Sequence, residues 1–230
     1  MSVRALKGGA LLCLPLMAIV TAHAPKVAAD APAQAAPAAA PAPSLETLFD
    51  AFAKSPGLEA HFREEKKIAL LFAPLRSEGV LHFDRTKGLA RHTLTPSKQS
   101  VLLSGGTLSL WDGTKTEKIE LKKTPELRAF ADGFSMLLAA DRPGLERSFK
   151  LEFSADPQGQ WRLRLLPFAK EVRAIVSEIE VAGKGIALRT LRVLEASGDE
   201  STTTFSDVDT QKRYSEAAAA AVFRVPPTAP

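Results

Sequence analysis

The chain has 230 residues, enough for one domain with a sizeable core, and its only cysteine is Cys13 in the N-terminal segment. The mature protein should therefore contain no disulfide, thiol nucleophile or cysteine-ligated metal. The full chain carries a formal net charge of +4, and removal of Arg4 and Lys7 lowers it by two to +2. This balance does not require a nucleic-acid partner.

Residues 1–24 are typical of a secretory signal peptide. Two cations precede the apolar run 10–20, which is too short to span a bilayer, and small residues at 22–24 form a cleavage site. Cleavage after residue 29 is an alternative, as is an uncleaved N-terminal anchor. The leader predicts export across the inner membrane and a periplasmic location.

Residues 25–43 consist largely of Ala and Pro and cannot bury a core, so we expect an extended linker. No internal repeat or second linker follows. We therefore predict a single folded domain over residues 44–227 and a short tail at 228–230.

The first element of the domain is a predicted helix. Ser44 is a suitable N-cap, Glu46 lies in the first turn, and Pro56-Gly57 ends the pattern. The apolar stripe has the spacing of one helix face and comprises Leu45, Leu48, Phe49 and Phe52.

Strand patterns follow this helix, with hairpin signals at Gly105-Gly106 and Asp112-Gly113. The predicted strands lie within Leu58–Leu71, Gly79–Asp84, Leu89–Leu94, Ser100–Ser104, Thr107–Asp112 and Lys118–Leu121.

A helical insertion interrupts the strands. Thr124-Pro125-Glu126 is a helix start, with a capping hydroxyl, a proline and an acid in order. Gly133 is a point where this helix could bend or divide. Helical spacing relates Leu127, Phe130, Phe134, Leu137 and Leu138. A further short helical turn is expected at Pro143–Arg147.

Strands then resume, and Ile175–Val181 fits either a strand or a helix. The other predicted strands are Phe149–Phe153, Trp161–Leu165, Ile186–Glu195, Ser201–Ser206 and Phe223–Val225. Roughly ten antiparallel strands tend to curl, and the two amphipathic helices are available to cover the apolar face. We expect a mainly β fold: an incomplete, half-open antiparallel β-barrel with an N-terminal helix and a helical lid over its concave face.

Several motifs in chain order resemble the LolA-like family of outer-membrane lipoprotein carriers. They cover about Leu45 to Pro227, nearly the whole predicted domain. The motifs are Ala60-His61-Phe62 with the charged Arg63-Glu64-Glu65-Lys66, Gly79-Val80-Leu81-His82-Phe83-Asp84-Arg85, Ser100-Val101-Leu102-Leu103-Ser104, Phe134-Ser135-Met136-Leu137-Leu138-Ala139 and Phe223-Arg224-Val225-Pro226-Pro227.

The resemblance implies a monomeric periplasmic carrier whose apolar cavity holds acyl chains and whose helical lid closes over it. It implies a lipoprotein or lipid cargo, an inner-membrane transporter or exporter, and an outer-membrane acceptor. It implies no catalytic residue, metal or cofactor. In the family an arginine after the second strand bonds to the lid and keeps the empty carrier shut. Arg85 occupies that place, although a solvated cation at a strand end is the alternative.

The candidate cavity residues share an apolar face of the predicted sheet or lid. They are Phe62, Leu81, Phe83, Leu89, Leu103, Leu110, Phe130, Phe134 and Leu138. Each of them could equally belong to a packed core, because sequence describes both with the same pattern.

The chain departs from the family pattern in one region. Thr86 replaces the usual proline, and the next strand carries Arg91 and His92 in place of aromatic residues. Arg91 is a candidate head-group contact, although periodicity leaves its face open. The two residues suit a lipid with a polar or anionic portion, or another amphiphile.

Two other function classes are alternatives. One is a lipid-sensing or interaction module of the same fold, although the chain shows no second domain to transmit a signal. The other is a periplasmic enzyme, but His61, His82 and His92 do not form a helical metal motif, and no nucleophile motif occurs.

Overall fold

The structure is a computed structural model that describes residues 42–226, except for the side chains of Pro125–Leu127, Ala129, Phe130 and Asp132. The described residues all belong to one compact unit. The predicted signal peptide, the linker up to residue 41 and the C-terminal tail lie outside the described residues. Within the described part, no helix is long and apolar enough to cross a membrane.

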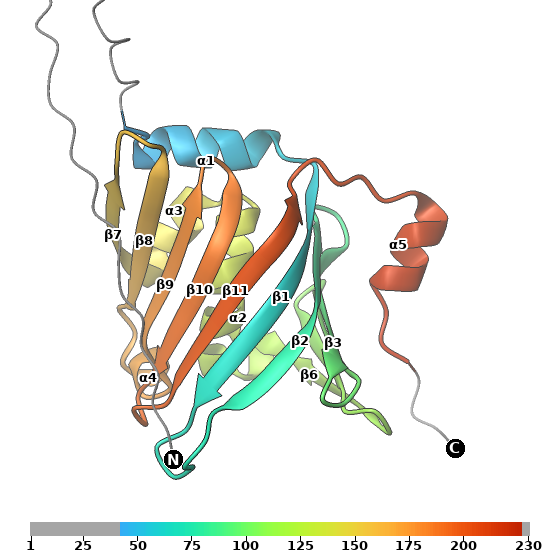
Figure 1. Ribbon diagram of the computed structural model, residues 1–230. Helices are drawn as coiled ribbons and strands as arrows, with labels where there is room; N and C mark the ends of the chain where they lie inside the picture. Colours follow the sequence, from blue (N-terminus) through green and yellow to red (C-terminus); the bar gives the residue numbers. More distant parts are fainter. Residues whose placement is uncertain (1–41, 227–230) are drawn as a thin grey trace, which may run out of the picture. The chain divides into compact units, whose positions relative to one another are not determined.

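Eleven strands form one antiparallel sheet in the order β6-β5-β4-β3-β2-β1-β11-β10-β9-β8-β7. Among the described residues β6 and β7 are the edges and do not pair, so the curled sheet is an open barrel (Figure 1). The strands are β1 (Gly57–Lys67), β2 (Leu75–Asp84), β3 (Gly88–Thr95), β4 (Gln99–Ser104), β5 (Thr107–Trp111), β6 (Thr116–Glu120), β7 (Phe149–Ala155), β8 (Gln160–Pro167), β9 (Val176–Lys184), β10 (Ala187–Glu195) and β11 (Glu200–Asp209).

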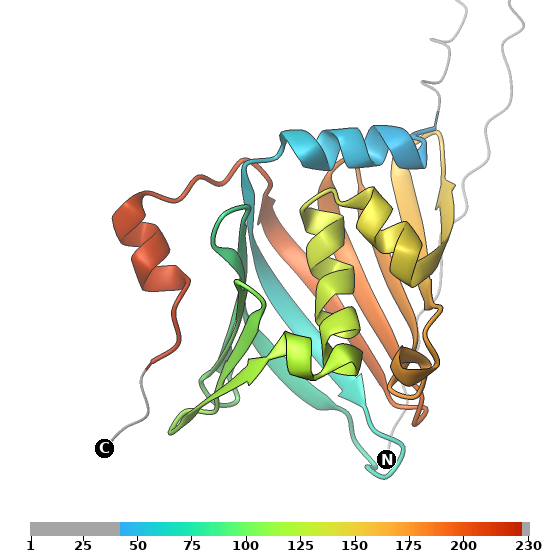
Figure 2. The ribbon, with the colours of Figure 1, turned by 180° about the vertical axis from the view of Figure 1, so that it is seen from behind.

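Helices cover one face and one end of this sheet. Figure 2 shows α2 and α3 lying against the concave face, while α1 crosses the end of the sheet. The helical elements are α1 (Leu45–Lys54), η1 (Leu121–Lys123), α2 (Pro125–Leu138), α3 (Arg142–Ser148), α4 (Lys170–Arg173) and α5 (Glu216–Val222). The predicted fold class, a half-open antiparallel barrel with an N-terminal helix and a lid helix, is confirmed.

The first helix forms as its sequence predicts. The Ser44 hydroxyl accepts a hydrogen bond from the Thr47 amide at 3.1 Å, and the Thr47 hydroxyl in turn accepts from the Ser44 amide at 2.9 Å. This reciprocal pair satisfies amides that have no partner inside the helix. The apolar stripe Leu48, Phe49 and Phe52 is buried against the end of the barrel.

Alternation along the strands sends apolar side chains to the concave face and polar ones to the convex face. On β8, for example, Leu163 and Leu165 are fully buried while Arg162 is exposed. The core is continuous under the helices and includes Leu58, Phe62, Phe83, Leu137, Phe149, Trp161, Ile179, Val181, Leu188 and Phe205.

The lid helix α2 runs unbroken through Gly133, so the possible break there does not occur. An added Cβ at this position would lie 3.0 Å from the Phe149 ring. The glycine therefore lets α2 approach β7 closely, which accounts for a residue that would otherwise weaken a helix.

The predicted strand Phe223–Val225 is wrong. The preceding residues form α5, with the Ser215 hydroxyl accepting a hydrogen bond from the Ala218 amide. An alanine run with a serine N-cap strongly favours a helix. Phe223 then packs edge-on against Tyr214, with ring centroids 5.0 Å apart, and it pairs with no strand. Residues 210–226, which follow β11 and include α5, are called the C-terminal arm. The ambiguous segment Ile175–Val181 proves to be β9.

A candidate ligand cavity beneath the lid helix

An apolar cavity of about 380 Å³ lies between the concave face of the sheet and α2. Its walls come from β3, β4, β5, β9 and β10, and α2 forms its cover. All ten lining residues are apolar: Leu89, Val101, Leu103, Leu108, Leu110, Ala131, Phe134, Ile179, Leu191 and Val193. Such a wall favours hydrocarbon and offers no partner for a charged group.

A second cavity of about 250 Å³ adjoins the first, because both are lined by Leu89, Val101, Leu103, Phe134, Leu191 and Val193. It adds a different set of residues from β1, β2, β3 and β11. The added apolar residues are Phe62, Leu81 and Phe205, and the added polar residues are Glu64, Arg91, Ser201 and Thr203. The combined space is therefore apolar along most of its wall and polar at one end.

Arg91 is held at this polar end by three contacts. Its guanidinium carbon lies 4.0 Å from the centre of the Phe62 ring, and Nη2 lies 3.3 Å from the Glu64 carboxylate. Nη2 also lies 3.4 Å from Ser77 Oγ. Burial lowers the pKa of the Arg91 guanidinium, and the Glu64 carboxylate opposes that shift. The guanidinium remains charged, with one carboxylate to balance it.

Strand register explains why these groups meet. Glu64 faces Ser77 on β2 and Thr203 on β11, and the Thr203 hydroxyl donates to the Glu64 carboxylate at 3.0 Å. Gly79 lies opposite Phe62, where a Cβ would be 2.8 Å from the ring and 2.0 Å from the His92 carbonyl oxygen. The glycine thus leaves room for the phenyl ring that supports Arg91.

The cover of the cavity is attached by aromatic packing. Phe134 of α2 stacks on Phe205 of β11, with the planes 4° apart and the centroids separated by 6.5 Å. Leu137 and Leu138, in the next turn, are buried in the core. Movement of α2 would therefore expose apolar surface unless a ligand replaced it.

Arg85 joins the ends of two helices. Its Nε donates to the Ser55 carbonyl at 2.8 Å and its Nη2 donates to the Phe52 carbonyl, both at the C-terminal end of α1. Its Nη1 donates to the Ala139 carbonyl, the C-cap of α2, at 3.0 Å. A cation between two helix C-termini is favourable, because the unpaired carbonyls there carry partial negative charge.

The structure brings most of the predicted cavity residues together. Seven of them line one or both cavities: Phe62, Leu81, Leu89, Arg91, Leu103, Leu110 and Phe134. Phe83 and Leu138 are corrections, because both are buried in the core and line neither cavity. Phe83 lies near the end of β2, opposite Leu58 of β1, and Leu138 lies in the last turn of α2. The Phe130 side chain lies outside the described residues.

Sequence reasoning missed ten of the seventeen residues that line the two cavities. The missed residues are Glu64, Val101, Leu108, Ala131, Ile179, Leu191, Val193, Ser201, Thr203 and Phe205. The alternation of β10 and β11 would have placed Leu191, Val193, Thr203 and Phe205 on one face. It could not have shown that this face curls to meet β3 and β4.

His92 lies on the opposite face from Arg91, so the interpretation of both as contacts for cargo is wrong for the histidine. Its Nε2 donates to the Val222 carbonyl at 2.8 Å, and its Nδ1 accepts from the Ser100 hydroxyl at 2.9 Å. Neighbouring residues of a strand point to opposite faces. His92 therefore holds the C-terminal arm on the convex side.

The match to a protein family covers nearly the whole described region. The family model described as "Outer membrane lipoprotein carrier protein LolA-like" matches residues 35–225. No curated protein sequence matches the chain significantly.

The solved structures that resemble this protein have little sequence identity to it. A LolA superfamily protein from Nitrosomonas europaea is 9% identical, with a TM-score of 0.38, and the match covers 71% of this chain and 92% of that one. A DUF1329 family protein from Desulfovibrio piger is 10% identical, with a TM-score of 0.46 and coverages of 76% and 94%. An outer membrane lipoprotein-sorting protein domain from Vibrio parahaemolyticus is 10% identical, with a TM-score of 0.43 and coverages of 76% and 95%.

Proposed function

Because the chain belongs to the family of LolA-like outer membrane lipoprotein carrier proteins, we propose that it is a periplasmic carrier of acyl chains. It binds the chains of a lipoprotein, lipid or similar amphiphile reversibly beneath α2 and moves them from the inner to the outer membrane. The observation that carries this proposal is the cavity of about 380 Å³ whose ten lining residues are all apolar.

The cavity has the chemistry that acyl chains require. Burial of hydrocarbon is favourable by about 0.8 kcal/mol per methylene, so a chain of a dozen carbons gains enough to bind without any polar contact. Protein interiors are normally packed without such voids, and an unfilled space forfeits dispersion contacts along its wall. A bound chain would restore them.

Release requires that the empty carrier be stable as well. When α2 lies on the sheet, Phe134 covers Phe205, and Arg85 ties the C-cap of α2 to α1. These contacts belong to the closed protein, and cargo that lifts α2 must replace them. The same contacts therefore lower the affinity for cargo to a level that permits transfer. We assign Arg85 the role of lid latch in this cycle.

The polar end of the cavity suits an amphiphile with a head group. Arg91 supplies a half-buried cation, and Glu64 and Thr203 supply hydrogen-bonding oxygens around it. An acyl chain can lie along the apolar wall while an anionic or hydroxyl-bearing group displaces part of the Arg91–Glu64 pair. We assign no chemical step to this site.

We also propose that the carrier is a monomer with two partners. One is a transporter in the inner membrane, and the other is an acceptor in the outer membrane.

Native mass spectrometry of the protein recovered from the periplasm tests the proposal. The spectrum should show a mass increment that solvent extraction removes and identifies as an acyl-chain compound. Phe134→Asp, which places a charge in the apolar wall, should abolish the increment, whereas Leu94→Asp at an exposed position of β3 should keep it. A wild-type protein that remains empty in repeated preparations contradicts the proposal.

A further inference from the structure

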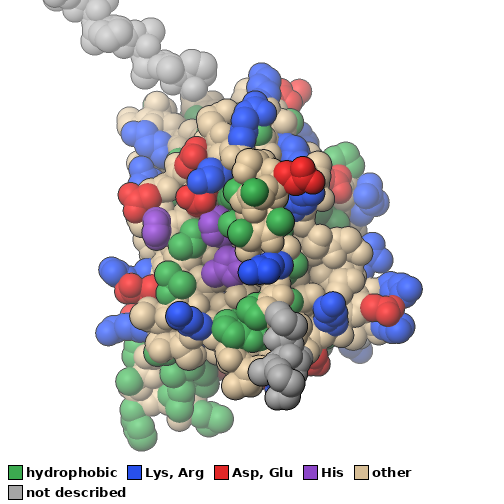
Figure 3. Space-filling model, turned by 90° about the vertical axis from the view of Figure 1, so that its right-hand side faces the viewer, with side chains coloured by type: hydrophobic (Ala, Val, Ile, Leu, Met, Phe, Trp, Pro, Cys, Tyr) green, Lys and Arg blue, Asp and Glu red, His purple; other side chains and the backbone are tan. Residues whose placement is uncertain are grey.

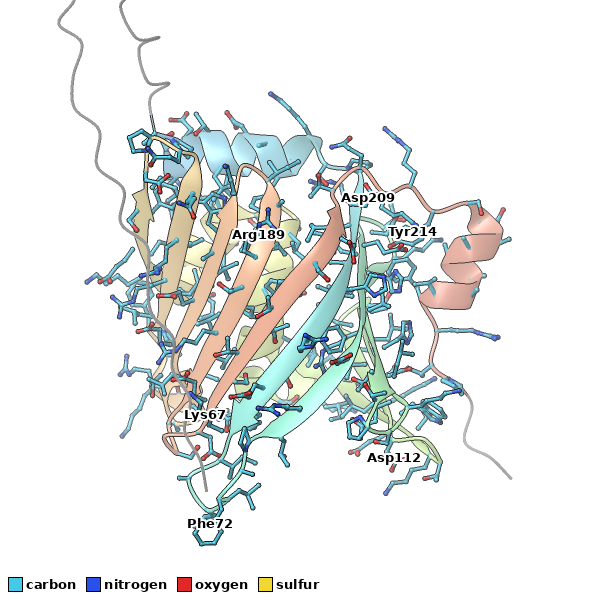
Figure 4. All side chains as sticks on the ribbon, viewed as in Figure 1. Lys67, Phe72, Asp112, Arg189, Asp209 and Tyr214 are labelled. Atoms are coloured by element: carbon cyan, nitrogen blue, oxygen red, sulfur yellow. The ribbon has the colours of Figure 1, made fainter. Side chains whose placement is uncertain are left out.

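The hairpin that joins β1 to β2 ends in an exposed apolar segment, here called the apolar tip and defined as Ile68–Leu75. It contains eight consecutive uncharged residues. Phe72 and Leu70 are almost fully exposed residues, at 111% and 92% of the accessible area of the free residue. Figure 4 shows Phe72 pointing away from the end of the sheet, and Figure 3 shows hydrophobic side chains gathered at this lower end of the molecule.

The apolar tip contributes little to the fold. Residues 68–74 of it lie beyond the last pair between the two strands, Lys66 and Leu75, so their side chains have no sheet to pack against. Its turn is nevertheless defined, because the Leu71 amide donates to the Ile68 carbonyl at 2.9 Å and the Ala69 amide donates to Asp199 Oδ1 at 3.0 Å. Contiguous exposed apolar side chains on an ordered loop indicate a surface that another apolar phase covers.

Other exposed apolar residues lie at the same end of the sheet. Strand pairing connects this end of β1 to the start of β9. Lys67 lies opposite Glu200 of β11, and Glu200 lies opposite Leu194 of β10. The next residue of β10, Glu195, lies opposite Val176 of β9. Phe168 and Ile175 flank α4 at this end, 51% and 45% exposed. The Ala196 amide of the β10–β11 turn donates to the Ile175 carbonyl at 2.9 Å. Of the seven large exposed apolar side chains in the described region, all but Leu94 therefore belong to this end.

Cations surround the apolar residues. Lys66 and Lys67 precede the apolar tip and Arg76 follows it, while Lys170 and Arg173 belong to α4. Two of these cations are paired, Lys66 with Glu195 at 2.6 Å and Arg76 with Glu65 at 3.1 Å. Long basic side chains can extend from an apolar surface toward lipid head groups while their alkyl stems stay buried.

We propose that this end of the protein docks on a lipid bilayer, with Leu70, Leu71 and Phe72 inserted among the acyl chains near the membrane surface. A bilayer fits a projecting tip whose side chains point in several directions, because it needs no complementary shape. The uncharged run and the cations at its base match the depth profile of a membrane interface. The polar end of the cavity lies toward the same end, since Glu64 precedes Lys66 by two residues on β1. This inference stands whatever the cavity holds.

An environment-sensitive dye at a single cysteine tests the docking directly. The full chain with Cys13→Ser has no other thiol, so Phe72→Cys can be labelled alone, and Leu94→Cys is the matched control at a half-exposed leucine on β3. The protein is mixed with protein-free vesicles of phosphatidylethanolamine and phosphatidylglycerol. We expect the dye at position 72 to shift to shorter wavelength and to be shielded from an aqueous quencher, while the dye at position 94 stays accessible.

A second measurement uses unlabelled protein. Phe72→Asp should lower the vesicle partition coefficient by about tenfold or more, because a buried aromatic ring is replaced by a charge. Its melting temperature and its co-purified cargo should match those of the wild type, which separates this test from that of the carrier function. Equal quenching at position 72 with and without vesicles overturns the proposal. So does a response that appears only with membrane proteins present, since it would assign the apolar tip to a protein partner.

Discussion

Arg85 Nη1 donates a hydrogen bond to the Ala139 carbonyl oxygen at 3.0 Å, although 54 positions separate the two residues. The contact joins the end of a sheet strand to the C-cap of the lid helix α2. The same guanidinium bonds to Ser55 and Phe52 at the end of α1. One side chain therefore fixes the position of the lid relative to the N-terminal helix.

Arg85→Leu should slow cargo release. The substitution removes bonds that stabilise the closed, empty carrier, while the loaded carrier with a displaced α2 loses less. Since a hydrogen bond to a charged group contributes roughly 1.5–3 kcal/mol, the dissociation rate of a fluorescent fatty acid should fall about tenfold or more. Stopped-flow displacement by unlabelled lipid measures that rate.

Arg85→Lys is the matched control for this test, because it keeps the charge near both helix ends but cannot reach three carbonyls at once. We expect an intermediate dissociation rate. If Arg85→Leu releases the fatty acid as fast as the wild type does, the latch role is wrong.

Arg91→Met should weaken the binding of chains that carry an anionic head group. The substitution removes the half-buried cation beside Glu64 and leaves the apolar wall unchanged. Titration should therefore show a loss of affinity for a fatty acid, on the order of tenfold, and little loss for the alcohol of equal length. Arg63→Met is the control, because Arg63 is an exposed cation of β1 that pairs with Glu78, and it should leave both affinities unchanged. An equal loss for the acid and the alcohol would show that Arg91 serves the fold alone.

His82 makes the attachment of the C-terminal arm sensitive to pH. The Tyr214 hydroxyl donates to the Leu58 carbonyl at 2.9 Å and lies 3.0 Å from His82 Nδ1, which is the donor in that contact. Burial lowers the pKa of the imidazole from 6.5 to about 4; the Glu59 carboxylate opposes this shift, and His92 and Lys212 add to it.

Stability should fall as the pH drops from about 6.5 to about 4. In that interval the unfolded chain binds a proton at His82 that the folded protein does not, so the free energy of unfolding decreases by up to about 3 kcal/mol. Urea unfolding between pH 7.5 and 4.5 measures this slope. His82→Gln should flatten it, and His61→Gln, at an exposed position of β1, should not. Parallel slopes for the wild type and His82→Gln would contradict the assignment.

Local sequence signals predicted the elements well where one residue decides a boundary. Ser44 as the α1 cap, Pro125 at the start of α2 and the turns at Gly105 and Gly113 all lie where expected. The strand predicted at Phe223–Val225 does not form, because the serine-capped alanine run just before it folds as α5.

The site was harder to predict, because the cavity depends on strand register. Periodicity left the face of Arg91 undecided, and only its pairing with Leu81 places it on the concave side with Phe62. Glu64, which pairs with Arg91, belongs to the charged run Arg63-Glu64-Glu65-Lys66. Such a run predicts side chains exposed to solvent. Curvature of the sheet also decides which apolar residues line a cavity and which, like Phe83, are buried in the packed core.

The dependence of affinity on acyl-chain length tests the central claim most directly. For a series of fatty acids, each added methylene should tighten binding about fourfold, until the chain fills the cavity and the affinity levels off. Leu191→Trp, which fills part of both cavities, should move that plateau to shorter chains without unfolding the protein. An affinity that does not change with chain length, or a plateau unmoved by Leu191→Trp, would contradict the binding of acyl chains beneath α2.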